Sequence, residues 1–251
     1  MSIKEVPAMA SLKLNLRLCL LVSLMASLLS FETKAEDGLV EVRVPEAQLE
    51  TYREERKGHS WVFGLGVENY LPTNFASAID GTAYGDMFGN SSVPIAAIDF
   101  GYKSNFSFGS IGLLAGYGTG QVGSAMSGEN RTLSIVKTAV RLQLALDTLF
   151  EEPYVVPYVA AGLYRFGIDE AATDAGLTFS GQTEFGTETT AGLLLQLNWL
   201  DEDSSRESRQ SAGLQNTFLN IFVSQFGATQ SSSDPETTSG WNLGAGLVLE
   251  F

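Results

Sequence analysis

The chain has 251 residues, and its 29 acidic against 15 basic side chains give a formal net charge of −14. This charge repels phosphate backbones and argues against nucleic-acid binding. One His and one Cys cannot build a Cys/His zinc site or a disulfide framework, so we expect no metal and no cofactor. Glycine is the unusual residue, because 26 of the 251 positions exceed the ~7% that is typical.

Residues 1–35 have the layout of a secretory signal peptide. A basic region precedes an apolar run over 18–31, and Thr33 and Ala35 are the small residues three and one positions before a cut. The run of 14 residues is shorter than the ~17 to 25 that a membrane-spanning helix needs, which favours cleavage after Ala35 over an uncleaved anchor. Cleavage would remove Cys19 and leave a chain without cysteine.

Residues 36–58 are a charged segment before the first strand. Like charges lie four residues apart, at Glu50 with Glu54 and at Arg53 with Lys57. The segment has no apolar face that could lie on a membrane. We expect a periplasmic N-terminal segment, either a short solvated helix or a tether.

From residue 59 onward the sequence alternates apolar and polar residues with a period of two, which is typical of strands with one apolar face. Between 136 and 146, even positions are Val, Thr or Leu, whereas the odd ones include Lys137 and Arg141. For 153–167 and 213–226 the sequence does not decide which residues face the apolar side, because apolar residues stand at both odd and even positions. The eight expected strands are 61–67, 96–102, 111–117, 136–146, 153–167, 191–199, 213–226 and 241–251.

A soluble β-sandwich would also alternate, but the strands favour a membrane barrel. Several run 10 or more residues, matching the ~9 to 11 that cross a bilayer at a tilt. Glycine and alanine crowd the polar face, as the narrow interior of an eight-stranded barrel requires. The glycines with interior parity are Gly64, Gly66, Gly101, Gly112, Gly116, Gly118, Gly192, Gly244 and Gly246.

The expected connections differ in length. Short turns on one side and long loops on the other are typical of a transmembrane barrel with periplasmic turns and extracellular loops. The sequence thus predicts an all-β, eight-stranded antiparallel transmembrane β-barrel over 59–251. Long connections are expected at 71–92, 120–131, 168–187 and 227–239, short ones at 105–109 and 148–152, and an intermediate one at 200–212.

Large aromatic residues near the ends of the expected strands fall at two heights if the first strand runs outward from the periplasm. Interfacial aromatic residues form such girdles at both edges of a membrane barrel. The periplasmic girdle is expected to contain Trp61, Tyr102, Trp199 and Phe251, and the outer girdle Tyr117, Trp241 and Tyr70.

The last strand places Trp241, Leu247, Leu249 and the C-terminal Phe251 on one face. It resembles the terminal-strand signal of bacterial outer-membrane proteins, and the chain is similar to small barrels of the OmpA, OmpX and OmpW type. The resemblance implies a location in the outer membrane of a Gram-negative bacterium. It also implies outer-membrane lipids, lipopolysaccharide and the barrel assembly machinery as partners. The assembly machinery would recognise Phe251. We expect a monomer and, because the sequence ends there, no downstream peptidoglycan-binding domain.

The interior parity of the strands carries charges of both signs. By strand direction, acidic and basic residues balance at each height of the barrel, which we interpret as a plug of paired charges. The alternative is a narrow ion path, since eight strands leave room only for side chains or one small ligand. The interior charges are Glu68, Asp99, Asp147 and Glu250 against Lys103, Lys137 and Arg141, with Arg165 as a further candidate.

A lipid A-modifying enzyme is a third hypothesis, because such barrels use a His with a Ser nucleophile, and His59 precedes Ser60 here. Adjacent residues on a strand point to opposite faces, and the pair lies at the periplasmic start of the first strand, away from the outer leaflet. We therefore expect no enzymatic activity.

The long loops are rich in carboxylates, Gly, Ser and Thr, and Arg131 is almost the only cation there. This composition predicts an envelope-structural or surface-interaction role. The loops are either a solvated surface beside lipopolysaccharide bridged by divalent cations, or an adhesive surface for a cationic partner. None follows the spacing of a calcium loop. Their carboxylates are Asp80, Asp86, Glu129, Asp169, Glu170, Asp174, Glu184, Glu188, Asp234 and Glu236.

Overall fold

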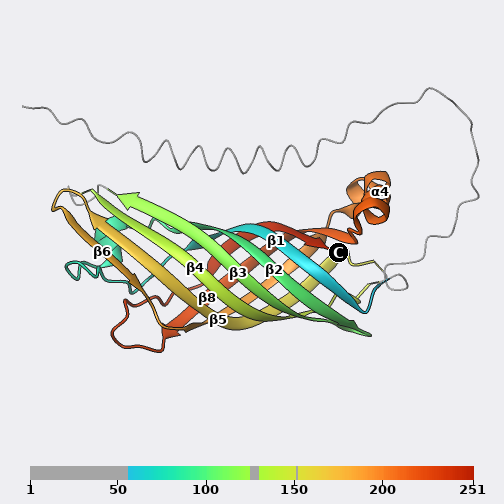
Figure 1. Cartoon of the computed structure of the whole chain (residues 1–251), viewed down its shortest axis with the longest axis horizontal. Helices are drawn as coiled ribbons and strands as arrows, with labels where there is room; N and C mark the ends of the chain where they lie inside the picture. Colours follow the sequence, from blue (N-terminus) through green and yellow to red (C-terminus); the bar gives the residue numbers. More distant parts are fainter. Residues whose placement is uncertain (1–55, 125–129, 151) are drawn as a thin grey trace, which may run out of the picture. The chain divides into compact units, whose positions relative to one another are not determined.

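A computed structural model describes residues 56–124, 130–150 and 152–251 (Figure 1). The expected signal peptide, 1–35, and residues 36–55 of the N-terminal segment lie outside this range. Within it, nine strands pair antiparallel in one sheet. They are β1 (His59–Tyr70), β2 (Val93–Phe106), β3 (Gly109–Ser124), β4 (Arg131–Ala145), β5 (Val155–Ala172), β6 (Leu177–Gln182), β7 (Gly186–Gln196), β8 (Asn216–Thr229) and β9 (Asn242–Glu250).

The sheet closes on itself because β4 pairs with β5 as well as with β3. Strands β6 and β7 share one place in the wall, since β5 pairs with β7 through Val155–Tyr164 and with β6 through Gly167–Ala172. The wall of the described barrel thus has eight positions, and the predicted eight-stranded antiparallel β-barrel is confirmed.

The strands are strongly tilted. The tilt can be measured by following paired residues once around the barrel, starting at Glu68 of β1. The path crosses β9, β8, β7, β5, β4, β3 and β2 and reaches Asn105. The Asn105 amide donates to the carbonyl oxygen of Gly58, next to β1. The register therefore shifts by 10 residues in one turn, from 68 to 58. Such a stagger accompanies a tilt of about 35–45° and a narrow interior.

The two ends of the barrel differ. The α3 end holds connections 71–92, 173–176 and 230–241, including α3 (Tyr84–Phe88). The α4 end holds turns 107–108, 146–154 and 197–215, including η1 (Asn198–Leu200) and α4 (Glu202–Ala212). Asp201 caps α4 by accepting a hydrogen bond of 3.0 Å from the Ser204 amide, which lowers the pKa of Asp201. In Figure 1, α4 and the C-terminus mark the α4 end and β6 the other.

The predicted connection 168–187 is wrong, whereas the one expected at 200–212 is present with wider bounds. Residues 168–187 are not a loop, because β5 continues to Ala172, turns tightly over 173–176 and returns as β6 and β7. Gly176, with a φ of 69°, supplies the left-handed residue of that turn. The connection 197–215 is longer than a simple turn because it contains α4.

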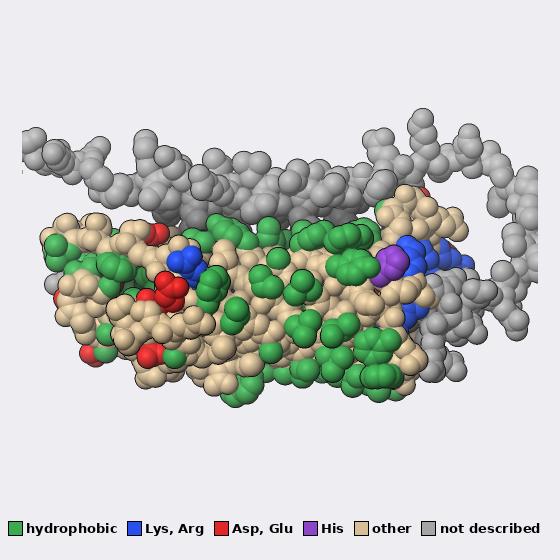
Figure 2. Space-filling model, turned by 60° about the horizontal axis from the view of Figure 1, so that its bottom comes forward, with side chains coloured by type: hydrophobic (Ala, Val, Ile, Leu, Met, Phe, Trp, Pro, Cys, Tyr) green, Lys and Arg blue, Asp and Glu red, His purple; other side chains and the backbone are tan. Residues whose placement is uncertain are grey.

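The outer and inner faces of the wall follow the alternation. Even-numbered residues point inward on β5 and β8. These are the two strands whose inward-facing residues the sequence left undecided. Arg165 consequently lies on the outer face, and its prediction as an interior charge is wrong. Figure 2 shows apolar side chains over the middle of the wall and toward the α4 end, with acidic side chains toward the α3 end.

Interior glycines make room for larger side chains. A Cβ atom at Gly116 would lie 2.5 Å from Asp99 Oδ1, and one at Gly192 would lie 2.7 Å from the carbonyl oxygen of Ile221. Both distances are far below ordinary contact. The glycine excess of the composition thus has a steric cause inside the barrel.

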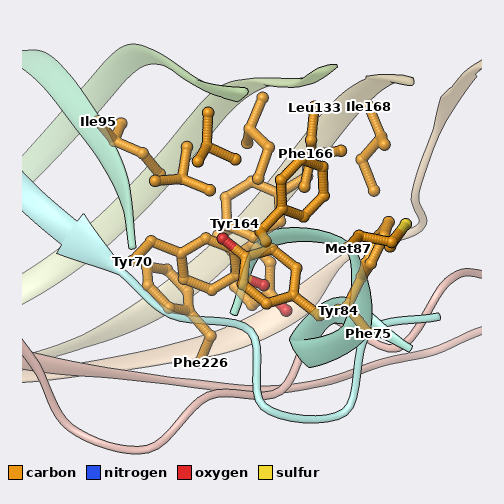
Figure 3. Packing of buried hydrophobic residues seen from close by; sticks show 14 of the residues in the cluster. Tyr70, Phe75, Tyr84, Met87, Ile95, Leu133, Tyr164, Phe166, Ile168 and Phe226 are labelled. Carbon is orange, nitrogen blue, oxygen red and sulfur yellow. The ribbon is translucent and has the colours of Figure 1, made fainter. Parts of the chain in front are cut away.

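An aromatic core fills the interior at the α3 end (Figure 3). The rings of Tyr70, Tyr164, Phe166 and Phe226 lie with centroids 4.7–5.4 Å apart, and all four side chains are buried. The prediction of Tyr70 in the outer girdle is therefore wrong, because residue 70 has the interior parity of β1. The connection 71–92 covers this core with further buried side chains, those of Phe75, Tyr84, Met87 and Phe88.

Candidate functional site

The charged interior of the barrel is the candidate site, and Lys137 lies at its centre. Its ammonium group is 2.9 Å from Glu68 Oε2 and 2.8 Å from Glu188 Oε1. All three side chains are buried. Ser224 Oγ donates to Glu68, and the Lys137 ammonium lies 4.6 Å from the centroid of the Phe226 ring. This contact joins the charges to the aromatic core.

Arg141 continues the network toward the α4 end. Its guanidinium pairs with Asp99 and, at 3.4 Å, with Glu188 Oε1, so Glu188 bridges both interior cations. The structure thus brings Glu68 together with Lys137, and Asp99 together with Arg141. The two ion pairs lie at neighbouring heights of the barrel.

Glu188 is a residue of this network that sequence reasoning placed wrongly. It was expected in an extracellular loop, but it lies on β7 with interior parity and is buried. The segment from Gly186 to Thr190 has polar residues at both parities, so apolar alternation is absent there. Extending the parity backward from Gly192 is the signal that would have found Glu188.

A second network lies at the α4 end around Asp147. This carboxylate accepts hydrogen bonds from Ser110 Oγ at 2.9 Å and from Lys103 Nζ at 3.3 Å. Lys103 also pairs with Glu250 at 2.7 Å. Asn216 donates to Glu250 at 3.3 Å, and these acidic and hydroxyl groups are buried.

Arg56 closes this second network from outside the strands. Its Nη2 lies 2.6 Å from Asp147 Oδ1 and 2.8 Å from the Gly109 carbonyl oxygen, and its Nη1 donates to Phe106 at 2.9 Å. Nη2 also donates to the Asn105 side chain. Bonds from one guanidinium to the ends of β2 and β3 and to the β4–β5 turn fix residues 56–58 across the α4 end.

Replacing Arg56 with Ala is expected to open the interior at the α4 end. The experiment uses a protein that lacks Cys19 and carries Gln143→Cys, so that residue 143 is the single thiol. Each hydrogen bond to a charged group contributes ~1.5–3 kcal/mol, so loss of the Arg56 bonds should make the open state more populated. We therefore expect a charged thiol reagent to modify residue 143 about tenfold faster. Gln143 lines the cavity beside Asp147. Lys57→Ala, which removes an exposed cation next to Arg56, is the control. Equal rates in all three proteins would contradict closure by Arg56.

A third ionic cluster holds the connection 71–92 at the α3 end. Arg131, the first residue of β4, pairs with Asp80 and lies 3.6 Å from Glu170 Oε1. Glu170 Oε2 accepts a hydrogen bond of 3.0 Å from the Ala78 amide. Glu170 was expected in a loop, but it faces inward on β5 and is buried.

The Arg131 guanidinium holds the pKa of Asp80 well below its usual range, and burial raises the pKa of Tyr84 on α3 to about 12. A carboxyl pKa that is lower in the docked than in the undocked state stabilises docking fully above the undocked value. This contribution shrinks as the pH falls below the undocked value and is gone below the docked one. The contribution of Asp80 to docking of 71–92 should therefore be complete at neutral pH and begin to decrease near about pH 3.9, the ordinary Asp value.

Asp80→Asn is expected to weaken docking of 71–92 near neutral pH, because the amide carries no charge to pair with Arg131, and the difference from the wild type should shrink as acid protonates Asp80. We expect proteinase K near neutral pH to cleave 71–92 faster, by no more than about fivefold, since Asp80 is partly exposed. Pepsin below about pH 4 extends the comparison through the titration range. Asp86→Asn, at an exposed residue of α3, serves as the control. Equal cleavage of the wild-type and Asp80→Asn proteins near neutral pH would refute the role of Asp80.

Two small cavities, of about 70 and about 40 Å³, flank the Asp99–Arg141 pair. They have room for a few water molecules each. Between them and the α3 end lies the aromatic core. The cavities are thus compartments in a filled interior, and their size suits water and no larger solute.

The remaining predicted residues point outward, Trp199 from η1 at the α4 end and the others from the wall or its edge. Trp61, Tyr102, Tyr117 and Trp199 are each at least 42% exposed. Trp61 stacks on Phe100 and Tyr102, and its backbone exchanges two hydrogen bonds with Phe251. Trp241, Leu247 and Leu249 share the outer parity of the strand that ends at Phe251.

His59 and Ser60 point to opposite faces. His59 is exposed and stacks on Tyr102 at 5.8 Å, whereas Ser60 is buried inside. Within the described residues, no group of three or more His, Cys, Asp or Glu is placed to hold a metal ion. No helix in that part of the chain is long and apolar enough to cross a membrane.

A closed antiparallel barrel with a charged interior and an apolar outer wall is the fold of small outer-membrane β-barrel proteins. Among solved structures, the chain is similar to Ail, the attachment invasion locus protein of Yersinia pestis, with 11% identity and a TM-score of 0.40 over 77% of this chain and 97% of that one. Neisserial surface protein A gives 14% identity and a TM-score of 0.45 over 78% and 98%. OprG of Pseudomonas aeruginosa gives 12% and 0.44 over 77% and 96%. No protein-family model and no curated protein matches the sequence.

Proposed function

We propose that this protein is a monomeric integral protein of the outer membrane of a Gram-negative bacterium, with the α4 end in the periplasm. The observation that carries the proposal is a belt of exposed apolar side chains around a closed wall. On β3, Ile111, Leu113 and Tyr117 are exposed, and on β4 the outward residues include Leu142 and Leu144. In water such a surface would be costly, whereas hydrocarbon covers it without penalty.

The belt has limits that match a bilayer. Beyond Tyr117 toward the α3 end, the outward residues of β3 are polar, as at Thr119 and Gln121. At the α4 end, exposed apolar residues continue onto the turns, at Phe108, Phe150 and Trp199. A band of about 25 Å flanked by aromatic residues is the pattern of outer-membrane barrels. The ends of β3, β4 and β5 and the whole of β6 would then project outside the membrane.

The class is tested by fractionation and heat-modifiable gel mobility. A folded barrel should be recovered in outer-membrane fractions and should migrate differently before and after boiling. Identical mobility together with absence from outer-membrane fractions would overturn the proposal.

For its role, we propose an envelope-structural or surface-interaction protein without ion conduction or enzymatic activity. Paired interior charges and the aromatic core argue against a path, and planar-bilayer recordings should show no steady nanosiemens conductance. The exposed His59, facing away from Ser60, argues against lipid A chemistry. Mass spectrometry of lipid A should be unchanged in a deletion strain.

The proposed partners follow from the two ends of the barrel. Lipopolysaccharide and divalent cations are proposed beside the acidic α3 end, where Asp169, Asp174 and Glu184 are exposed. A cationic protein partner is the alternative for the same surface. The barrel assembly machinery is the proposed partner of the last strand during biogenesis, with Phe251 as the recognised residue.

A further inference from the structure

A groove of about 430 Å³ runs over the outer wall where β5 and β7 pair. Its floor consists of small residues, because Ala161 pairs with Thr189 and Val159 pairs with Ala191. On the neighbouring β4, larger residues occupy the outward positions, as at Val140, Leu142 and Leu144. The residues that form this β5–β7 groove include Leu144, Val159, Ala161, Thr189, Ala191 and Trp241.

The groove has the size and polarity of a binding site for one hydrocarbon chain. A methylene group takes up roughly the ~30 Å³ of one water molecule in the liquid, so the groove has room for about a dozen of them. Trp241, 65% exposed at the start of β9, gives the groove a large aromatic side wall. Thr189 is the one polar residue of the floor named above, and its side chain is small.

A cation lies on the α3 side of the groove, on the same strand as Ala161. Arg165 lies on β5 four residues past Ala161 toward the α3 end, with the same outward parity. On the described barrel strands it is the one Lys or Arg that faces outward, since Lys103, Arg131, Lys137 and Arg141 all face inward. Its position at the edge of the apolar belt is where lipid headgroups lie.

The guanidinium of Arg165 is held in place but retains donors for a ligand. Its Nε donates to the Thr183 carbonyl oxygen at 2.6 Å, and its Cζ lies 5.7 Å from the centroid of the exposed Phe185 ring. The two Nη groups make no hydrogen bond to the described residues. Two parallel N–H groups of a guanidinium match a phosphate group.

We propose that the β5–β7 groove binds one acyl chain of an anionic lipid of the outer leaflet, whose phosphate-bearing headgroup contacts Arg165. The proposal rests on the proposed insertion in the outer membrane and adds a specific lipid site to it. The apolar floor selects a hydrocarbon chain, and the outward cation on its α3 side selects a negative headgroup over a zwitterionic one.

Trp241 allows a direct test by fluorescence quenching. The chain has three tryptophans, so Trp61→Phe with Trp199→Phe leaves Trp241 as the single reporter. The full barrel is reconstituted in phosphatidylcholine vesicles that contain brominated phosphatidylglycerol or, separately, brominated phosphatidylcholine. We expect phosphatidylglycerol to be enriched about fivefold beside Trp241, since one cation near a membrane surface contributes ~1 kcal/mol.

Matched variants separate the groove from the general surface. Arg165→Gln and Ala161→Phe should each abolish the enrichment, whereas Arg165→Lys should retain part of it. Ala115→Phe makes the same change on an exposed outward residue of β3 outside the groove and should have no effect. A reporter with Trp61 alone should show no lipid preference.

The outcomes are distinct. Equal quenching by both lipids at Trp241, or equal enrichment at Trp241 and Trp61, overturns the lipid site while the membrane proposal stands. Enrichment that persists in Ala161→Phe also overturns it, because the groove would then not be the binding site. A protein that shows no heat-modifiable mobility after reconstitution fails at insertion, which refutes the proposed function as well.

Discussion

Replacing Lys137 with Met is expected to lower the free energy of unfolding by about 3–5 kcal/mol, the cost of removing one partner from a buried ion pair. Lys137 is the cation nearest to Glu68, at 2.9 Å, and it also neutralises Glu188 at 2.8 Å. Met retains most of the side-chain volume, so the loss reports charge. Equilibrium urea unfolding of the barrel in lipid vesicles, followed by heat-modifiable mobility, measures it.

Two controls isolate the charge effect. Lys57→Met changes an exposed lysine before β1 and should cost less than about 0.5 kcal/mol. Adding Glu68→Gln and Glu188→Gln to Lys137→Met should restore much of the stability, because the buried carboxylates that have lost the Lys137 cation are then neutral. A Lys137→Met protein as stable as the wild type would mean that water, and not Lys137, compensates these carboxylates.

The sequence predicted the barrel wall because lipid and interior impose opposite demands on neighbouring residues. Within the apolar belt, an outward Leu142 and an inward Arg141 differ so strongly that parity alone assigns each face. The same contrast orients Asp99 and Lys103 on β2. Where both parities are apolar, as around Tyr158 on β5, the assignment needed the pairing with β4 and β7.

Toward the α3 edge of the belt this contrast weakens, and there the predictions were wrong. Thr187 and Thr189 face outward beside the inward Glu188, so polar residues stand at both parities and suggest a loop. The error at Arg165 was different, because this residue was predicted to face inward but faces outward. A cation is tolerated on the outer face at the height of the lipid headgroups. Sequence periodicity reports the solvent on each side of a strand, and it is informative only where the two sides differ.

Contacts from outside the strands could not be predicted from periodicity. Arg56 reaches Asp147 across 91 positions of the chain, and its segment has no pattern that indicates an inward side chain. Met87 and Phe88 lie in a connection that was expected to be a solvated loop, but they pack on the aromatic core. Tertiary contacts decide such positions, since each requires the barrel to be formed first.

Replacing Phe226 with Ala is the corresponding test of the aromatic core, with an expected loss of about 3–5 kcal/mol in the free energy of unfolding. The Phe226 ring packs 4.8 Å from Tyr164 and 5.2 Å from Tyr70, and 4.6 Å from the Lys137 ammonium. Its removal leaves a cavity that the rigid wall cannot close. The same vesicle unfolding experiment measures the loss.

Ile221→Ala on the same strand is the matched control, because Ile221 faces the apolar belt and is 42% exposed. Lipid chains can follow the shortened side chain there, so no cavity remains and the cost should be well below that of Phe226→Ala. Equal costs at the two positions would mean that the α3 end is a water-lined mouth and not a packed core. The barrel would then lack its outer closure, and a measurable conductance would be expected in place of a silent bilayer.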